Sequence, residues 1–126
     1  MRSTTRVPIT VATALALVAL AGLASSAKPH PTPPDSVSVV ATAEQKFVPA
    51  VIVMHVGRPT TVRFSSSGGV HGVASTELGI PATTIMPDTP VSVVVTPKKV
   101  GTYKLPCTIV CGPNHADMLL TVQVKP

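Results

Sequence analysis

The sequence is poor in aromatic and acidic residues. It has no tryptophan, one tyrosine, two phenylalanines and five acidic residues among 126. Its ten lysines and arginines are spread out without interleaved aromatic residues, which argues against nucleic acid as a partner. Residues 65–69 contain glycine but no lysine at the offset of a phosphate-binding loop. No general acid–base pair is evident either, so we expect no catalysis by this chain alone.

The N-terminus has the layout of a secretory leader. Arg2 and Arg6 precede the 21 uncharged residues 7–27, and small residues end this run. The run also suffices for a membrane anchor, since a bilayer span needs about 20 apolar residues. We therefore expect a signal peptide or membrane anchor at residues 1–27, with residues 7–27 as the route to any membrane association. Both interpretations place the rest of the chain outside the cytoplasm, because the arginine end stays inside.

A short linker precedes the folded part. Residues 28–36 contain four prolines, which favour an extended conformation. The remaining domain, residues 37–126, is small enough that a disulfide or a metal commonly supplements its core.

The domain shows the pattern of an all-β fold. Proline, glycine and serine interrupt it every ~8–12 residues, and no window after Lys28 has a helical period. Three segments alternate with the period of a strand, and further strands are expected at 37–43 and 102–107. The alternating segments are 52–56, 60–65 and 120–125. We expect an antiparallel sandwich or barrel. The valine-rich residues 91–95 predict a strand that is buried on both faces.

One loop concentrates the metal-binding side chains. Residues 107–118, between two predicted strands, hold both cysteines, one of four histidines and one of four methionines. Thiolate, imidazole and thioether form a soft ligand set that suits copper. A single-copper electron-transfer site uses one cysteine, whereas Cys107 and Cys111 could bridge two copper ions. His115 would supply one nitrogen ligand, and Met118 a weak axial ligand.

A second nitrogen ligand must come from outside this loop. His30 lies in the linker, and His55 falls on the outward face of its predicted strand. His71 lies at a strand end between glycines, which allow close backbone approach. His71 is therefore the preferred candidate, and a backbone carbonyl within the cysteine loop could fill the remaining weak position.

Two simpler interpretations of the loop stay open. Cys107 and Cys111 could form a disulfide, as is common outside the cytoplasm. A Cys2His2 set could also hold zinc, although Met118 would then have no role.

The spacing Cys-x3-Cys-x3-His-x2-Met resembles the dinuclear CuA loop of cytochrome c oxidase subunit II and of nitrous oxide reductase. Residues 111–118 are especially similar to the subunit II form, and 70–72 and 78–80 resemble the segment with that family's first histidine. Residues 47–57 resemble the opening strands of the same domain. The resemblance covers about residues 37–125 and implies a cupredoxin-like Greek-key β-sandwich.

The resemblance also implies a ligand set and a function. Two copper ions would be bridged by two thiolates, with one terminal imidazole each, an axial thioether on one and an axial backbone carbonyl on the other. The bridging thiolates would be Cys107 and Cys111, and the terminal imidazoles His71 and His115. The axial ligands would be Met118 and the carbonyl of Ile109. The function implied is extracytoplasmic electron transfer with a redox partner such as a cytochrome or a haem–copper oxidase. The alternatives are a reduced oxidase subunit II that feeds such an oxidase, and copper storage or delivery.

Overall fold

The computed structural model describes Gly22, Lys28 and residues 35–126. The expected leader, most of the expected linker and His30 therefore lie outside the described residues. Among the residues that are described, no helix is long and apolar enough to cross a membrane.

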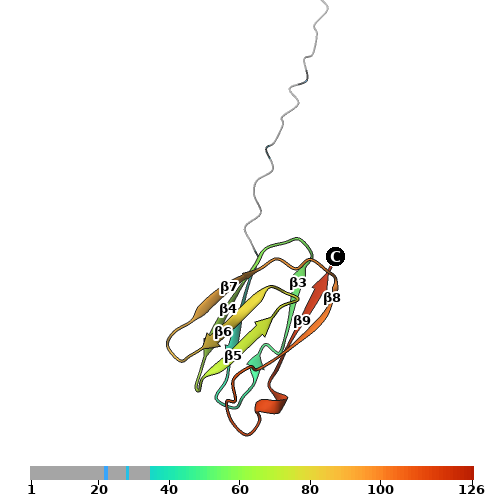
Figure 1. Cartoon of the computed structure of the whole chain (residues 1–126). Coiled ribbons are helices and arrows are strands. Elements are labelled where there is room, and N and C mark those ends of the chain that lie inside the picture. The colour runs from blue at the N-terminus through green and yellow to red at the C-terminus, as the bar shows by residue number, and fades with distance from the viewer. Residues whose placement is uncertain (1–21, 23–27, 29–34) are drawn as a thin grey trace, which may run out of the picture. The chain divides into compact units, whose positions relative to one another are not determined.

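The described part of the chain is built from nine strands and one short 3-10 turn (Figure 1). This confirms the predicted all-β class. The elements are β1 (Asp35–Ala41), β2 (Phe47–Val48), β3 (Val51–His55), β4 (Thr60–Ser66), β5 (His71–Ser75), β6 (Ile80–Ile85), β7 (Val91–Val95), β8 (Gly101–Pro106), η1 (His115–Asp117) and β9 (Leu119–Lys125).

The strands form two sheets and a ribbon. One sheet has the order β2-β1-β4-β7, the other has the order β3-β9-β8, and β5 pairs with β6. The expected β-sandwich is confirmed, but the pairs β1–β4 and β3–β9 are parallel, so the expectation of an antiparallel arrangement was wrong for these two pairs. The reason is the path of the chain: it leaves the first sheet after β2, forms β3 in the second sheet, and returns as β4 beside β1.

Period-two alternation places one face of each sheet in the core. In β4, Val62 and Phe64 are buried while Arg63 between them is exposed. In β9, Leu120 and Val122 are likewise buried, as predicted. Successive side chains of a strand point to opposite faces, so each sheet contributes one apolar surface to the space between the sheets.

β7 departs from its prediction. Val94 is 63% exposed and Ser92 is also exposed, so only one face of this strand meets the core. β7 lies at the edge of its sheet and pairs only with β4. The valine-rich sequence therefore does not indicate burial on both faces of β7, because the neighbouring elements cover only one face of this strand.

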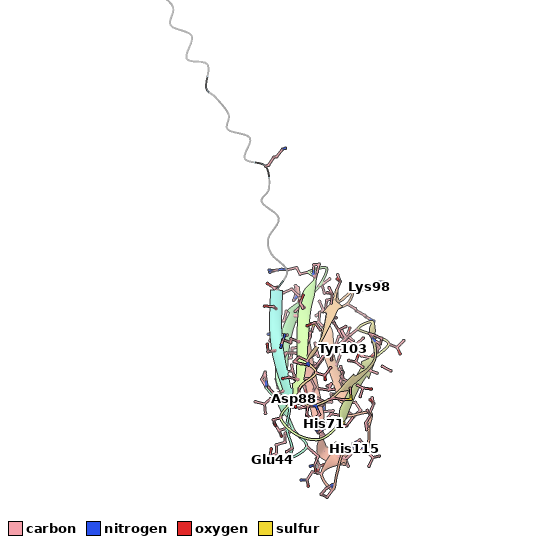
Figure 2. All side chains as sticks on the ribbon, turned by 90° about the vertical axis from the view of Figure 1, so that its left-hand side faces the viewer. Glu44, His71, Asp88, Lys98, Tyr103 and His115 are labelled. Carbon is pink, nitrogen blue, oxygen red and sulfur yellow. The ribbon has the colours of Figure 1, made fainter. Side chains whose placement is uncertain are left out.

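The loop between β8 and β9 lies at one end of the sandwich. The two strands are antiparallel neighbours, and their last ladder pair joins Pro106 and Leu119. Beyond it, the Cys107 N–H donates to the Met118 carbonyl at 2.9 Å, which draws the two ends of the loop together. Figure 2 shows His71 and His115 toward this end of the domain, and Lys98 toward the other.

We expect Phe64→Ala to lower the free energy of unfolding by about 3–5 kcal/mol, because it leaves a cavity between the sheets. Arg63→Ala, at the neighbouring exposed position of β4, should change it by less than about 0.5 kcal/mol. Urea unfolding measures both. Equal effects of the two variants would contradict this description of the core.

Candidate metal centre

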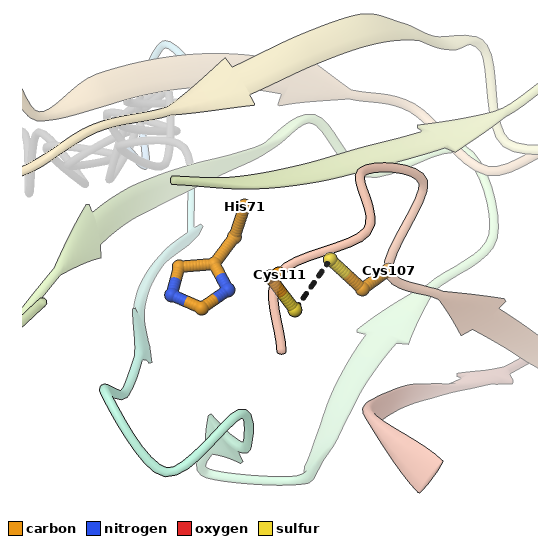
Figure 3. Close-up of side chains that lie close together, drawn as sticks. All are labelled: His71, Cys107 and Cys111. Carbon is orange, nitrogen blue, oxygen red and sulfur yellow. Dashed lines mark hydrogen bonds between the residues drawn. The ribbon is translucent and has the colours of Figure 1, made fainter. Parts of the chain in front are cut away.

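The two cysteines face each other without a bond between them. Their Sγ atoms are 3.7 Å apart, and both cysteines are free (Figure 3). A disulfide would bring the sulfurs to about 2.05 Å. The disulfide considered above is therefore not formed in this structure. Cys107 is buried and Cys111 is half-buried.

His71 brings an unpartnered nitrogen to this pair. The side chain is 1% exposed, and its Nε2 lies 2.8 Å from the Gly68 carbonyl oxygen. A carbonyl only accepts, so Nε2 carries the proton and Nδ1 keeps a free lone pair. Nδ1 is buried and finds no hydrogen-bond partner among the described residues. Figure 3 shows a ring nitrogen directed toward the cysteines, and the ligand atoms of the three residues lie within 4.8 Å of one another.

The other candidate side chains contact Cys111. The Cys111 Sγ lies 3.6 Å from Nδ1 of His115 and 3.6 Å from Sδ of Met118. Met118 is fully buried, whereas His115, at the start of η1, is half-buried. The η1 turn is closed by the Met118 N–H, which donates to the His115 carbonyl at 3.1 Å. This turn is what brings both side chains back to the same sulfur.

The backbone of Ile109 also reaches the cluster. Its carbonyl oxygen lies 3.2 Å from Sγ of Cys107, so the structure places all six residues named from the sequence around the two sulfurs. His55, in contrast, pairs with Lys125 in the ladder of β3 and β9, away from the loop. This agrees with its predicted place on an outward strand face.

β5 holds the cysteine loop through its backbone. The Gly72 N–H donates to Sγ of Cys107 at 3.5 Å, and the Thr108 N–H donates to the Gly72 carbonyl at 3.1 Å. A Cβ atom on Gly72 would lie 2.9 Å from Cγ1 of Ile109 and closer still to the Thr108 hydroxyl. The close backbone approach expected of the glycines beside His71 is therefore realised at Gly72.

One neighbour of the loop carries no signal in the sequence. Gln45, in the turn between β1 and β2, accepts a hydrogen bond from the Asn114 N–H at 3.0 Å. A single glutamine in a polar turn, 69 residues from its partner, has no spacing that could reveal this contact.

Burial raises the pKa of the Cys111 thiol, and its hydrogen bond and charge interaction with Cys107 raise it further. The folded, metal-free protein therefore favours the neutral thiol at this position. A metal ion would have to displace its proton, because the thiolate is the form that binds metals.

The donor set fits copper. Two sulfurs 3.7 Å apart can both reach one ion, since metal–thiolate bonds are about 2.3 Å in zinc sites. The free lone pair of His71 and the buried thioether of Met118 complete a soft set around them.

A comparison with known families agrees with this architecture. Residues 13–122 match the family of cupredoxin-like domains. The chain belongs to this cupredoxin-like family. The comparison with curated protein sequences gave no significant match.

Several solved structures share the fold of this cupredoxin domain. The periplasmic domain of subunit II of cytochrome oxidase (CoxB) of Bradyrhizobium japonicum matches with a TM-score of 0.63 at 14% identity, over 71% of this chain and 83% of that chain. A chain of a heme-copper terminal oxidase dimer matches with a TM-score of 0.61 at 21% identity, over 74% and 66%. Reduced auracyanin from Roseiflexus castenholzii matches with a TM-score of 0.56 at 18% identity, over 72% and 97%.

We expect Gly72→Ala to destabilise the cupredoxin domain by about 1–3 kcal/mol, because the added methyl group forces β5 and the cysteine loop apart. Gly101→Ala is the matched control, since the nearest atoms to its Cβ would be those of Tyr103, at an ordinary 3.6 Å or more. Urea unfolding of the metal-free proteins measures both. A Gly72 variant as stable as the Gly101 variant would contradict the close contact.

The raised pKa of Cys111 predicts how the stability of the metal-free domain depends on pH. The unfolded chain loses this proton first, near pH ~8.5, so the free energy of unfolding is fully retained below that pH and falls as the pH rises through the higher folded pKa. Cys111→Ser should remove this part of the decline. Urea unfolding from about pH 7 to about pH 10 tests it, and parallel curves for the two proteins would rule it out.

Proposed function

We propose that this cupredoxin domain binds two copper ions in a CuA-like centre and transfers electrons. The observation that carries the proposal is the pair of free sulfurs 3.7 Å apart beside the unpartnered Nδ1 of His71. A single-copper site of the blue type uses one cysteine. Here a second cysteine, Cys107, is buried among the other candidate ligands, which supports a shared, two-ion site.

Each of the six residues has a stated role in this proposal. The thiolates would bridge the ions, the imidazoles would bind one ion each, and the thioether and a backbone carbonyl would be weak axial ligands. The thiolates are those of Cys107 and Cys111, and the imidazoles those of His71 and His115. The thioether belongs to Met118 and the carbonyl to Ile109. Two copper ions joined through thiolates would supply one-electron redox chemistry with the charge spread over both.

The surroundings of the loop suit electron transfer because they limit its movement. The backbone hydrogen bonds from Cys107 to Met118 and from Thr108 to Gly72 fix both arms of the loop in the metal-free protein. Leu105 and Leu120 are fully buried where β8 and β9 approach the loop, and such apolar cover keeps water from the ligands. Small changes in geometry between oxidation states favour fast transfer.

The proposal includes a place and a partner. We propose that the domain works outside the cytoplasm, on the basis of Arg2, Arg6 and the uncharged run after them. The partner would be another redox protein, such as a cytochrome or a haem–copper oxidase. The shared fold with the periplasmic subunit II domain and with a chain of a heme-copper oxidase supports this choice.

Copper reconstitution tests the function directly. We expect two copper ions per chain, and an electron-spin resonance spectrum with hyperfine splitting from two equivalent copper nuclei. A single-copper spectrum, or preferred and stable zinc occupancy, would contradict the dinuclear site. Two bound Cu(I) ions that pass to a chelating acceptor without any stable mixed-valence state would instead favour storage or delivery.

Among the variants, Cys111→Ser should abolish the two-copper spectrum, because it removes a bridging thiolate and the contact shared by His115 and Met118. His55→Ala, away from the loop, should leave both the spectrum and the copper stoichiometry unchanged. Circular dichroism confirms that each variant is folded. An unaltered spectrum in the Cys111 variant would refute the ligand assignment.

A further inference from the structure

The turn between β1 and β2 is strained at Gln45. The Thr42 N–H donates to the Lys46 carbonyl at 2.8 Å, and the Gln45 N–H donates to the Thr42 carbonyl at 3.0 Å. Gln45 has a φ of 57° in this turn. Residues other than glycine seldom adopt this left-handed conformation, and when they do it often serves a function.

The strained residue directs its side chain onto the ligand loop. Oε1 of Gln45 accepts the Asn114 N–H at 3.0 Å, and Nε2 donates to the Ala43 carbonyl, which fixes the orientation of the amide. The amide also lies flat against Gly112: a Cβ there would be 2.7 Å from Cδ and Oε1 of Gln45 and 2.9 Å from Nε2. Gly112 has a φ of 149°, so a glycine suits both its conformation and this contact.

These contacts lie between two of the proposed ligands. Gly112 and Asn114 belong to the segment that joins Cys111 to His115, and this segment is exposed to solvent. The His115 N–H donates to the Gly112 carbonyl at 3.1 Å, so the spacing of the two ligands depends on how this turn is held. Gln45, from the β1–β2 turn, contacts this Cys111–His115 segment.

We propose that Gln45 is a positioning residue that fixes the Cys111–His115 turn before copper binds. The proposal rests on the function proposed above, because it gives Gln45 its role through the two copper ligands. A turn that is already held in the conformation of the bound state loses less conformational entropy when copper binds. Loss of the contact should therefore weaken copper retention without removing a ligand.

Two variants distinguish this positioning role from a purely structural role in the β1–β2 turn. Gln45→Asn keeps an amide and suits the left-handed conformation better, but it is one methylene too short to reach Asn114. Gln45→Glu keeps the length and the acceptor oxygen for the Asn114 N–H, although it cannot donate to the Ala43 carbonyl and suits the turn no better. The positioning role predicts that Glu preserves the contact and Asn loses it, whereas a purely structural role predicts the reverse order.

The first measurement is amide hydrogen exchange of Asn114 in the metal-free full chain. In Gln45→Asn we expect exchange to speed up about tenfold relative to wild type, the equivalent of one lost hydrogen bond. Exchange in Gln45→Glu should be slower than in Gln45→Asn, because glutamate keeps the acceptor for the Asn114 N–H. The second measurement is the rate of copper transfer from the loaded protein to a chelator, which should rise about tenfold in Gln45→Asn only.

The results distinguish failure of this inference from failure of the proposed function. Unchanged exchange and copper release in Gln45→Asn, or a Glu variant that behaves like the Asn variant, would overturn the positioning role even if wild type shows the two-copper spectrum. A wild-type protein without that spectrum would overturn the function. The exchange of Asn114 would still report on the contact, since it is measured without metal.

Discussion

The close approach of the β5 backbone to the cysteine loop is the constraint on which the rest of the site depends. Gly72 both donates to the Cys107 sulfur and accepts from the Thr108 N–H, and it leaves no room for a side chain between the two segments. Because Gly72 directly follows His71, the same contact brings the imidazole to the sulfurs. The hydrogen bonds of Gly72 thus join the strand that carries His71 to the cysteine loop, although Gly72 and Cys107 lie 35 residues apart in the sequence.

The metal-free structure already has much of the geometry that a copper site needs. The unpartnered Nδ1 of His71 is costly in a protein interior, where nearly every polar atom is hydrogen-bonded. The raised pKa of the half-buried Cys111 likewise reflects partial burial and the neighbouring Cys107 thiol, which disfavour a negative charge until a cation arrives. Both costs would be relieved by a metal ion, which is a reason to interpret them as features of a binding site rather than of the core.

Local patterns in the sequence predict part of this arrangement. Alternation in β4 and β9 revealed their inward faces, and the resemblance of the loop correctly indicated the fold family. The parallel pairing of β1 with β4 could not be predicted, because pairing depends on segments far apart in the chain. The exposure of Val94 depends on its place at a sheet edge, and the contact of Gln45 on a turn meeting a distant loop. Five of the candidate ligands were found because their side-chain chemistry is scarce in this chain. Ile109 was named only through the resemblance, because its ligand atom would be a backbone carbonyl oxygen. The structure brings all six together, and their roles as ligands stay a proposal.

The central claim is that one sulfur pair is shared by two copper ions. A crystal structure of the copper-loaded protein, with anomalous scattering recorded at the copper edge, tests it most directly. The account predicts two copper peaks, each contacting both Cys107 and Cys111, with Nδ1 of His71 bound to one and His115 bound to the other. A single peak held by one cysteine, or a disulfide between the two cysteines with no copper, would contradict it.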